Sequence, residues 1–398
     1  MTLLDICICT IIFLVGFNLK NFFSGFNNSD KSWLNKLFFF HFLVAITFHF
    51  YIEANGGDAI KYWNLPKNGT FDDVWFLVVN RRASSFMYFF NFFPANTLQL
   101  SMFTGNMMYA LLGYLGFIYL FKTIKELFKD TATLYSLKLM RVSIFPLLLF
   151  LPNLHFWSSG IGKDVILFFS IIIFVYALLD VRKRMSLLFI SLLLSILIRP
   201  HITLFLLIAF SIGYLIDGRL KGYQKILVFL LLVAGFVSMF QYVVQFIQLD
   251  SLEVSSIEEF ANTRVSNLSR QRTESSIDIS GYPFPLKVFT FLYRPLFFDI
   301  TGALAILSSF ENLILLIFTI MVMVSNPIKA FRRSSHLMKG MLIFFIVGAI
   351  SFSLILGNLG IMLRQKNMFI PFFFIFGIWV LYYKKNGNKA IDASTSGN

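Results

Sequence analysis

Apolar segments of near-bilayer length recur along the whole chain, and they limit its possible folds more than any other feature. A transmembrane helix needs about 20 predominantly apolar residues. Hydrophobic residues make up 57% of the chain and charged residues only 14%, a balance that soluble cores do not use. The sequence predicts an all-α integral membrane protein with about eleven transmembrane helices, some short enough to be tilted or merged. The expected segments are 3–19, 37–53, 100–121, 142–157, 165–180, 186–198, 202–216, 226–246, 302–324, 340–356 and 368–383.

The positions of Lys and Arg predict which way the chain crosses the membrane. Cytoplasmic loops carry an excess of these residues. If the polar segments alternate in side, 21 of the 34 Lys and Arg fall on one side, which we assign to the cytoplasm. The first apolar segment lacks a basic start and a small-residue cleavage pattern, so we interpret it as a span and not as a signal peptide. The N-terminus is therefore expected outside and the C-terminus inside.

Residues 1–385 are expected to form a single helical membrane domain, followed by a short disordered tail over 386–398. Two long external segments interrupt it, over 54–98 and 247–286. The first is rich in aromatic residues and, over 74–93, is typical of a helix lying at the membrane interface or re-entering a cavity. Within the second, the Ser-rich stretch 262–278 is typical of a mobile lid, with an ordinary surface loop as the alternative. No Gly-rich phosphate loop appears, so nucleotide hydrolysis is not expected.

Acidic residues in the first external segment are the candidate catalytic groups. Asp58 follows two glycines directly after the second apolar segment. The chemical interpretation is a catalytic or metal-organising carboxylate, and the structural one is a helix cap, a common role of Asp. Asp72 and Asp73 form a second option. These acids show no metal-ligand spacing, so no metal site and no cofactor is assigned, and metal dependence stays open.

Several cations lie against apolar segments on the side where Lys and Arg should be scarce. Such cations need an anionic partner or a water-filled cavity. Each has a structural alternative, namely a snorkelling side chain, compensation of Lys163 by Asp164, or pairing of Arg294 with Asp299. Together they favour an anion site, because the planar donor fork of arginine binds diphosphate oxygens bidentately. The candidates are Arg81, Arg82, Lys163, Arg199, His201, Arg294 and Arg364.

Four of these elements together resemble a known group of proteins. They are Gly-Gly-Asp58-Ala-Ile-Lys-Tyr-Trp, Phe156-Trp-Ser-Ser-Gly-Ile-Gly-Lys-Asp164, Arg199-Pro-His201 and Arg294-Pro-Leu-Phe-Phe-Asp299. The chain resembles the bacterial O-antigen and capsular repeat-unit polymerases, the Wzy and EpsG-like groups, which share features with GT-C membrane glycosyltransferases. The resemblance extends over most of the chain. It implies a GT-C-like bundle in the bacterial cytoplasmic membrane.

The resemblance also implies a reaction and partners. A growing glycan would move from undecaprenyl diphosphate onto another lipid-linked repeat unit on the outer side of the membrane. In GT-C enzymes an acidic residue of the first external loop serves as base or metal organiser, and Asp58 matches it. External arginines would bind the diphosphate. The implied partners are the lipid-linked oligosaccharide, membrane lipids and a chain-length regulator, and no nucleic acid is expected.

Two other functions stay open. A GT-C transferase that moves one sugar from a polyprenyl-phosphate donor is one, although such enzymes usually add a soluble C-terminal domain that this sequence lacks. A lipid-linked oligosaccharide flippase is the other. A flippase would need ionisable residues deep in its spans, whereas the centres of the expected helices carry almost no charge. A scaffold without activity is disfavoured by the charged outer rim.

Overall fold

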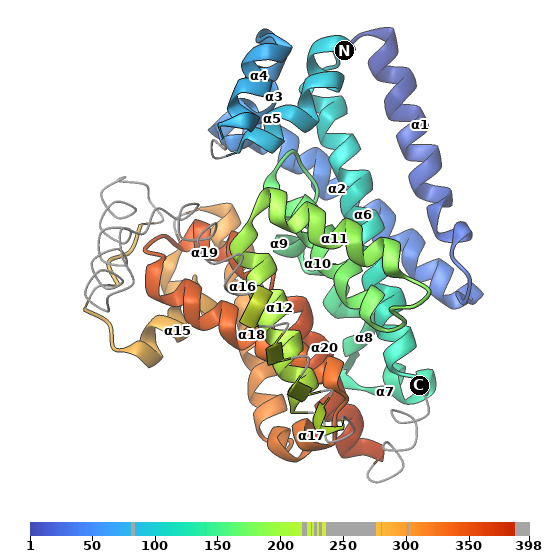
Figure 1. The fold of residues 1–398 in the computed structure, drawn as a ribbon, viewed down its shortest axis with the longest axis vertical. Coiled ribbons are helices and arrows are strands. Elements are labelled where there is room, and N and C mark those ends of the chain that lie inside the picture. The colour runs from blue at the N-terminus through green and yellow to red at the C-terminus, as the bar shows by residue number, and fades with distance from the viewer. Residues whose placement is uncertain are drawn as a thin grey trace. The chain divides into compact units, whose positions relative to one another are not determined.

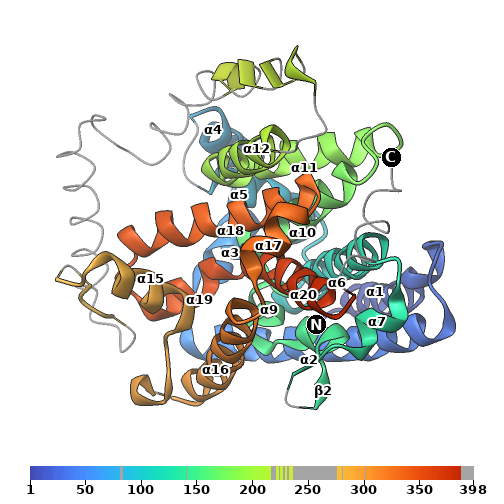
Figure 2. The ribbon, with the colours of Figure 1, turned by 90° about the horizontal axis from the view of Figure 1, so that it is seen from below.

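The computed structural model shows mostly helices in the part of the chain that it describes (Figures 1 and 2). Its helices form two compact units. Unit 1 consists of Met1–Thr123 and Leu149–Arg199, and unit 2 of Ile124–Leu148 and Pro200–Asn398. Each unit has its own helices and its own core. The described residues are 1–80, 84–139, 141–216, 221–223, 225–226, 229–230, 233–235, 276–279, 281–300 and 302–386.

Five described helices are long and apolar enough to cross a membrane. They include α1 (Leu3–Leu19), α2 (Asn28–Asn55), α6 (Met102–Leu127), α16 (Ala303–Met323) and α18 (His336–Ile355). A sixth candidate is a pair bent by 58°, made of α19 (Leu359–Lys366) and α20 (Ile370–Asn386). The expectation of an all-α protein with membrane-spanning helices is confirmed in this coarse form, while the count of eleven stays a prediction.

Other expected spans differ from the structure in length or in kind. Three appear as helices shorter than 18 residues: α10 (Lys163–Leu178), α11 (Met185–Ile198) and α12 (Pro200–Leu215). Most of 226–246 lies outside the described residues.

The segment 142–157 is not one helix. Pro146 and Pro152 lack an amide donor and interrupt a helical ladder, and the chain there forms short elements instead. These are β2 (Val142–Ser143), paired with β1 (Lys138–Leu139), then α8 (Ile144–Leu147), the 3₁₀ turn η3 (Leu148–Phe150) and α9 (Pro152–Trp157).

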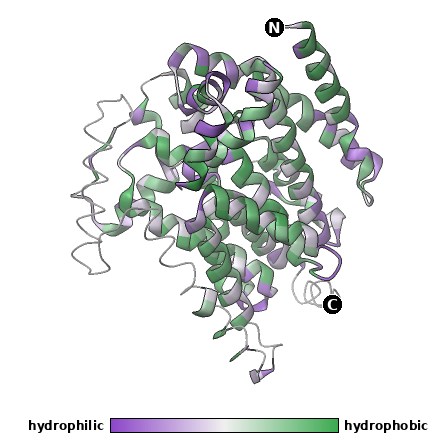
Figure 3. Cartoon of the chain, turned by 45° about the horizontal axis from the view of Figure 1, so that its top comes forward, coloured by the Kyte–Doolittle hydropathy of each residue, from purple (hydrophilic) through white to green (hydrophobic). Residues whose placement is uncertain are grey.

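In unit 1, α1 packs beside α2 through aromatic rings, and a buried acid ties its start to α6. Figure 3 shows α1, next to the N-terminus, as apolar along most of its length. The Asp5 side chain accepts hydrogen bonds from the Ser101 amide at 2.8 Å and from the Thr104 hydroxyl at 2.6 Å. Because the first amides of a helix lack partners, this carboxylate satisfies the start of α6. The N-terminus and the start of α6 therefore lie at the same end of unit 1.

The segment 54–98, expected to be external, folds into short helices at this same end. They are α3 (Asp58–Asn68), α4 (Phe71–Val79), α5 (Ser85–Phe92) and the π-helical turn η2 (Phe93–Thr97). The Asn96 side chain donates to the carbonyls of Pro66, Lys67 and Gly69 and so closes the end of α3. The interfacial helix expected over 74–93 appears as two helices, α4 and α5, and residues 81–83 between them are not described.

The short turn before α10 is held tightly inside unit 1. A side chain on Gly160 would meet the ring of Phe48 on α2, and one on Gly113 of α6 would meet the carbonyl of Ser158. Downstream, Ser170 and Ser191 each donate to the other's carbonyl at 2.8 Å, which joins α10 to α11. Small residues therefore let the turn approach α2 and α6 closely.

In unit 2, α18 packs against both α12 and α20 (Figure 2). Gly213 and Gly340 allow the backbones of α12 and α18 to touch, since a side chain at either would collide with the other helix. Unit 2 also contains α7 (Thr131–Ser136), α15 (Phe284–Tyr293), the 3₁₀ turn η4 (Phe297–Asp299) and α17 (Pro327–Arg333), and in unit 1 the 3₁₀ turn η1 (Lys20–Phe22) follows α1. The segment expected as a lid, 262–278, lies outside the described residues except for its last three positions.

Candidate functional site

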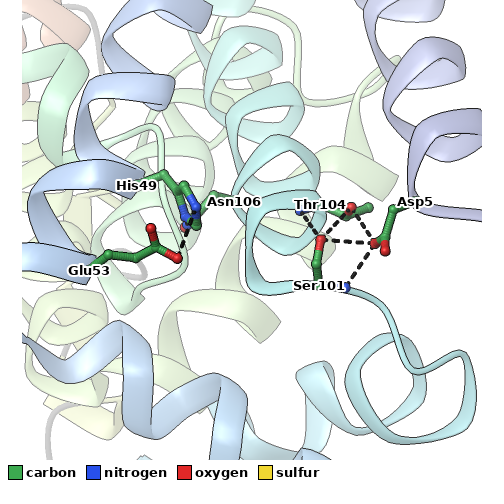
Figure 4. A network of polar contacts seen from close by, with 6 residues as sticks. All are labelled: Asp5, His49, Glu53, Ser101, Thr104 and Asn106. Carbon is green, nitrogen blue, oxygen red and sulfur yellow. Dashed lines mark hydrogen bonds and ion pairs between the residues drawn. The ribbon is translucent and has the colours of Figure 1, made fainter. Parts of the chain in front are cut away.

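The polar end of unit 1 contains a contact between a histidine and a glutamate of one helix. His49 and Glu53 lie one turn apart near the end of α2, with His49 Nε2 3.3 Å from Glu53 Oε1. The histidine side chain is 7% exposed and the glutamate side chain 55%. Figure 4 shows Asn106 of α6 on the other side of the imidazole. A buried ring therefore supports a carboxylate that reaches the surface of the unit.

Hydrogen bonds fix the protonation form of this imidazole. The amide of Ile161 donates to Asn106 Oδ1 at 2.9 Å, so the Asn106 nitrogen must point the other way. That nitrogen donates to His49 Nδ1, also at 2.9 Å. Because Nδ1 accepts, the proton of the neutral ring is on Nε2, the atom that faces Glu53. The arrangement thus directs an N–H group at the carboxylate.

Asp58 lies just beyond this pair, across the turn between α2 and α3. Gly56 and Gly57 have φ of 79° and 150°, values that favour glycine, and they allow the chain to reverse between the two helices. The helix cap is Gly57, and Asp58 is the first residue of α3 and exposed. Burial raises the pKa of Tyr88 on α5, and the negative charge of Asp58 raises it further.

The turn that carries Ile161 also carries two of the expected charges. Lys163 begins α10, and Asp164 follows it in the first turn. Arg199, directly after α11, places Nη2 3.3 Å from Asp164 Oδ1, with the two side chains 12% and 7% exposed. Compensation of Lys163 by Asp164 was the structural alternative to a phosphate contact, and the structure also gives Asp164 an ion pair with Arg199. Short contacts therefore connect Glu53, through His49 and Asn106, to the turn that bears Lys163.

The second acidic option has a structural role at the start of α4. The Thr70 side chain and Asp73 form a reciprocal capping box. Hydrogen bonds from Thr70 lower the pKa of Asp73. Asp72 lies exposed in the same first turn, where the helix dipole favours a negative charge. Arg81 and Arg82 lie outside the described residues.

The remaining expected cations belong to unit 2. Arg294 donates to both carboxylate oxygens of Asp299, from Nε at 2.9 Å and from Nη2, so the expected pairing alternative is confirmed. The hydrogen bond to Asp299 raises the pKa of Arg294. His201 lies in the first turn of α12, with its ring 6.2 Å from that of Phe352. Arg364 is half-buried on α19.

A buried lysine holds three elements of unit 2 together near Arg294. Lys366 is 2% exposed and donates to the Leu292 carbonyl at 3.1 Å and to Asn312 Oδ1. The Asn312 nitrogen in turn donates to the Pro295 carbonyl at 2.8 Å. Because the last carbonyls of a helix lack partners and carry partial negative charge, Lys366 stabilises the end of α15.

The predicted site residues thus fall into two groups. Asp58, Asp72, Asp73, Lys163 and Arg199 belong to unit 1, and His201, Arg294 and Arg364 to unit 2. The sequence analysis missed His49, Glu53 and Asn106. The available signal was the spacing of His49 and Glu53, which puts both side chains on one face of a helix.

Comparison with protein-family models, with curated proteins and with solved structures finds no match to this chain. The functional argument therefore rests on the residues and their geometry.

Proposed function

We propose that this protein is a glycosyltransferase that joins undecaprenyl-diphosphate-linked oligosaccharide repeat units on the outer side of the bacterial cytoplasmic membrane. The observation that carries the proposal is the polar end of unit 1. There Glu53 and Asp58 flank one turn, and hydrogen bonds lead from His49 to the turn with Lys163. Carboxylates and cations at the end of apolar helices match the needs of a reaction on a lipid-linked diphosphate.

The proposed reaction needs a base and a site for a departing anion. The acceptor hydroxyl attacks the anomeric carbon of the donor sugar, and the bond from that carbon to the diphosphate oxygen breaks. The undecaprenyl diphosphate leaves with the electron pair. A carboxylate at the junction of α2 and α3 takes the hydroxyl proton, with Asp58 as the choice from sequence. Lys163 and Arg199 stabilise the charge of the leaving diphosphate.

From the sequence, the cations that belong to unit 2 are also proposed as diphosphate-binding residues. Arg294 is aligned by Asp299, and the fork that holds a carboxylate is the geometry that also holds a phosphate. His201 and Arg364 complete this proposed set. Arg81 and Arg82 of the first external segment are proposed for the same role on the basis of the sequence alone.

The test uses lipid-linked repeat units extracted from a bacterial strain that lacks the gene for this chain. The purified protein in lipid nanodiscs is incubated with this extract, and the products are separated by length. We expect a ladder of glycans that differ by whole repeat units, together with released undecaprenyl diphosphate. The variant Arg199→Ala should lower the yield, and Glu126→Gln, at the far end of α6, should not.

The same assay separates the alternatives. A product longer by one sugar would identify a single-sugar transferase, which is the second candidate because the proposed base and cations serve that reaction equally. Unchanged repeat units that move across the membrane of a sealed vesicle would identify a flippase. Either result would refute the polymerase proposal.

A further inference from the structure

We infer that Glu53 is the catalytic base of the proposed reaction and that His49 and Asn106 are its positioning residues. This inference rests on the proposed function and assigns its proton-accepting step to one carboxylate. The acceptor hydroxyl forms its bond to the anomeric carbon, the diphosphate leaves with the electrons of the broken bond, and the hydroxyl proton passes to a Glu53 oxygen. No oxidant, reductant or further reactant is needed.

The first support is the direction of the hydrogen bonds. Asn106 cannot turn its amide around, because its oxygen accepts from the Ile161 amide and a reversed side chain would oppose two donors. His49 Nδ1 is therefore an acceptor, and Nε2–H faces Glu53. An imidazole held in this form orients a carboxylate without competing for the proton that the carboxylate must accept.

The second support is the gradient of exposure along these contacts. Asn106 is 0% exposed and His49 is 5% exposed, whereas the Glu53 side chain is 55% exposed. A rigid, buried support behind an accessible carboxylate is the arrangement that a base requires, because the proton donor must reach one oxygen while the side chain keeps its direction. Figure 4 shows both supporting side chains behind the Glu53 carboxylate.

The third support is that the parts come from three separate segments. Glu53 and His49 belong to α2, Asn106 to α6, and Ile161 to the turn before α10. An ordinary contact between residues one turn apart adds little to the stability of a helix and needs no support from other segments. The hydrogen bonds through Asn106 to Ile161 also connect the base to the turn that bears Lys163. Lys163 lies two residues after Ile161 and is proposed to act on the leaving group.

The experiment measures kcat and KM for polymer formation by the full chain in lipid nanodiscs, with the extracted lipid-linked repeat units. Glu53→Gln should lower kcat by about 10²- to 10⁴-fold, the usual contribution of a general base, and leave KM nearly unchanged. The matched control Glu126→Gln should keep the parental kcat. If Glu53→Gln keeps the parental kcat and Asp58→Asn loses it, the inference is wrong and Asp58 is the base.

Two variants of His49 separate positioning from simple packing. His49→Gln places an amide nitrogen near the former Nε2 and should keep most of kcat. His49→Leu fills similar space without a donor and leaves the Asn106 nitrogen without its acceptor, so its melting temperature should fall modestly. Assayed well below the melting temperatures of both variants, His49→Leu should lower kcat by roughly 10- to 100-fold. Equal loss of kcat in both variants, or loss that follows melting temperature, would overturn the positioning role. A parent protein that forms no glycan from the extract would instead refute the proposed function, and this inference with it.

Discussion

Arg199 and Asp164 join the end of α11 to the first turn of α10, with 3.3 Å between guanidinium and carboxylate and little exposure of either side chain. The two residues are 35 positions apart in the chain. Asp164 also lies where a helix dipole favours an anion, so one carboxylate supports two helix ends. Asp164 directly follows Lys163 in the first turn of α10, in the part of unit 1 proposed to receive the diphosphate.

We expect Asp164→Asn to lower the free energy of unfolding by about 1.5–3 kcal/mol, because it removes the charge of one carboxylate that contacts a mostly buried guanidinium. Asp180→Asn is the matched control. Its partner Lys183 lies at the same distance, 3.3 Å, but with side chains 34% and 84% exposed, so the loss should stay below about 1 kcal/mol. Denaturant unfolding in one detergent measures both variants. Equal losses in the free energy of unfolding would mean that the ion pair of Arg199 and Asp164 contributes no more stability than an exposed ion pair.

The ion pair of Arg294 and Asp299 should make the stability of the protein depend on pH. Burial alone would raise the pKa of Asp299, but hydrogen bonds from Arg294 and the Leu296 amide, with the Arg294 charge, lower it. A carboxyl group whose pKa is lowered in the folded state stabilises the protein at pH values above its unfolded-state pKa of about 3.9. This contribution to the free energy of unfolding is lost as the pH falls through the folded-state pKa. The parent protein should therefore be more stable than Asp299→Asn above about pH 4, and this extra stability should disappear as the pH falls further.

Thermal unfolding of the two proteins from about pH 6 downward measures this difference. A difference in melting temperature that stays constant over the whole pH range would contradict the assignment.

The variant Arg294→Lys is less informative about ligand binding than the sequence alone suggests. Lysine cannot reproduce the two-point contact to Asp299, so it would lose function through structure as well as through a diphosphate.

The long spans could be predicted because each is one uninterrupted apolar segment. α1, α16 and α18 coincide with expected segments to within a few residues. The segment 142–157 has the same composition, but apolar content alone does not separate a helix from a folded-back chain, and two prolines decide the outcome. Division of the chain into two compact units follows from contacts between distant segments, which a span-by-span analysis does not contain.

The candidate site was predictable only in part, for a related reason. Asp58, Lys163 and Arg199 are recognisable because each is a charge beside an apolar segment, where it needs an explanation. His49 and Asn106 lie within the apolar segments 37–53 and 100–121, which were interpreted only as membrane spans. The orientation of both side chains depends on the hydrogen bond from the Ile161 amide, and a backbone donor cannot be recognised from residue types.

We predict that reporter fusions at Lys129 and Lys221 give a cytoplasmic signal and that a fusion at Lys67 gives an external one. The structure supports the relative placement inside unit 1, since Asp5 near the N-terminus bonds to Ser101, directly after the first external segment. An external signal at Lys129 would overturn the assigned orientation. A fusion at Lys67 that reports the cytoplasm would contradict it independently.

The packing of α3 on α6 should control both stability and activity. Gly105 of α6 lies against the ring of Trp63, which is 1% exposed, and a Cβ at Gly105 would come within 2.5 Å of that ring. Gly105→Ala gains at most about 1 kcal/mol of helix propensity. Forcing an extra carbon into a filled core costs about 1–3 kcal/mol, so the net effect should be destabilising.

Because α3 begins at Asp58, a displaced Trp63 also moves this carboxylate away from Glu53 and the neighbouring turn. We therefore expect Gly105→Ala to lower the melting temperature and the yield of polymer together. Gly281→Ala is the control, since a Cβ there meets no atom within 4 Å. Unfolding and glycan ladders measured for both variants test the idea. If Gly105→Ala matches the control in both, the contact of Trp63 with α6 does not position the start of α3.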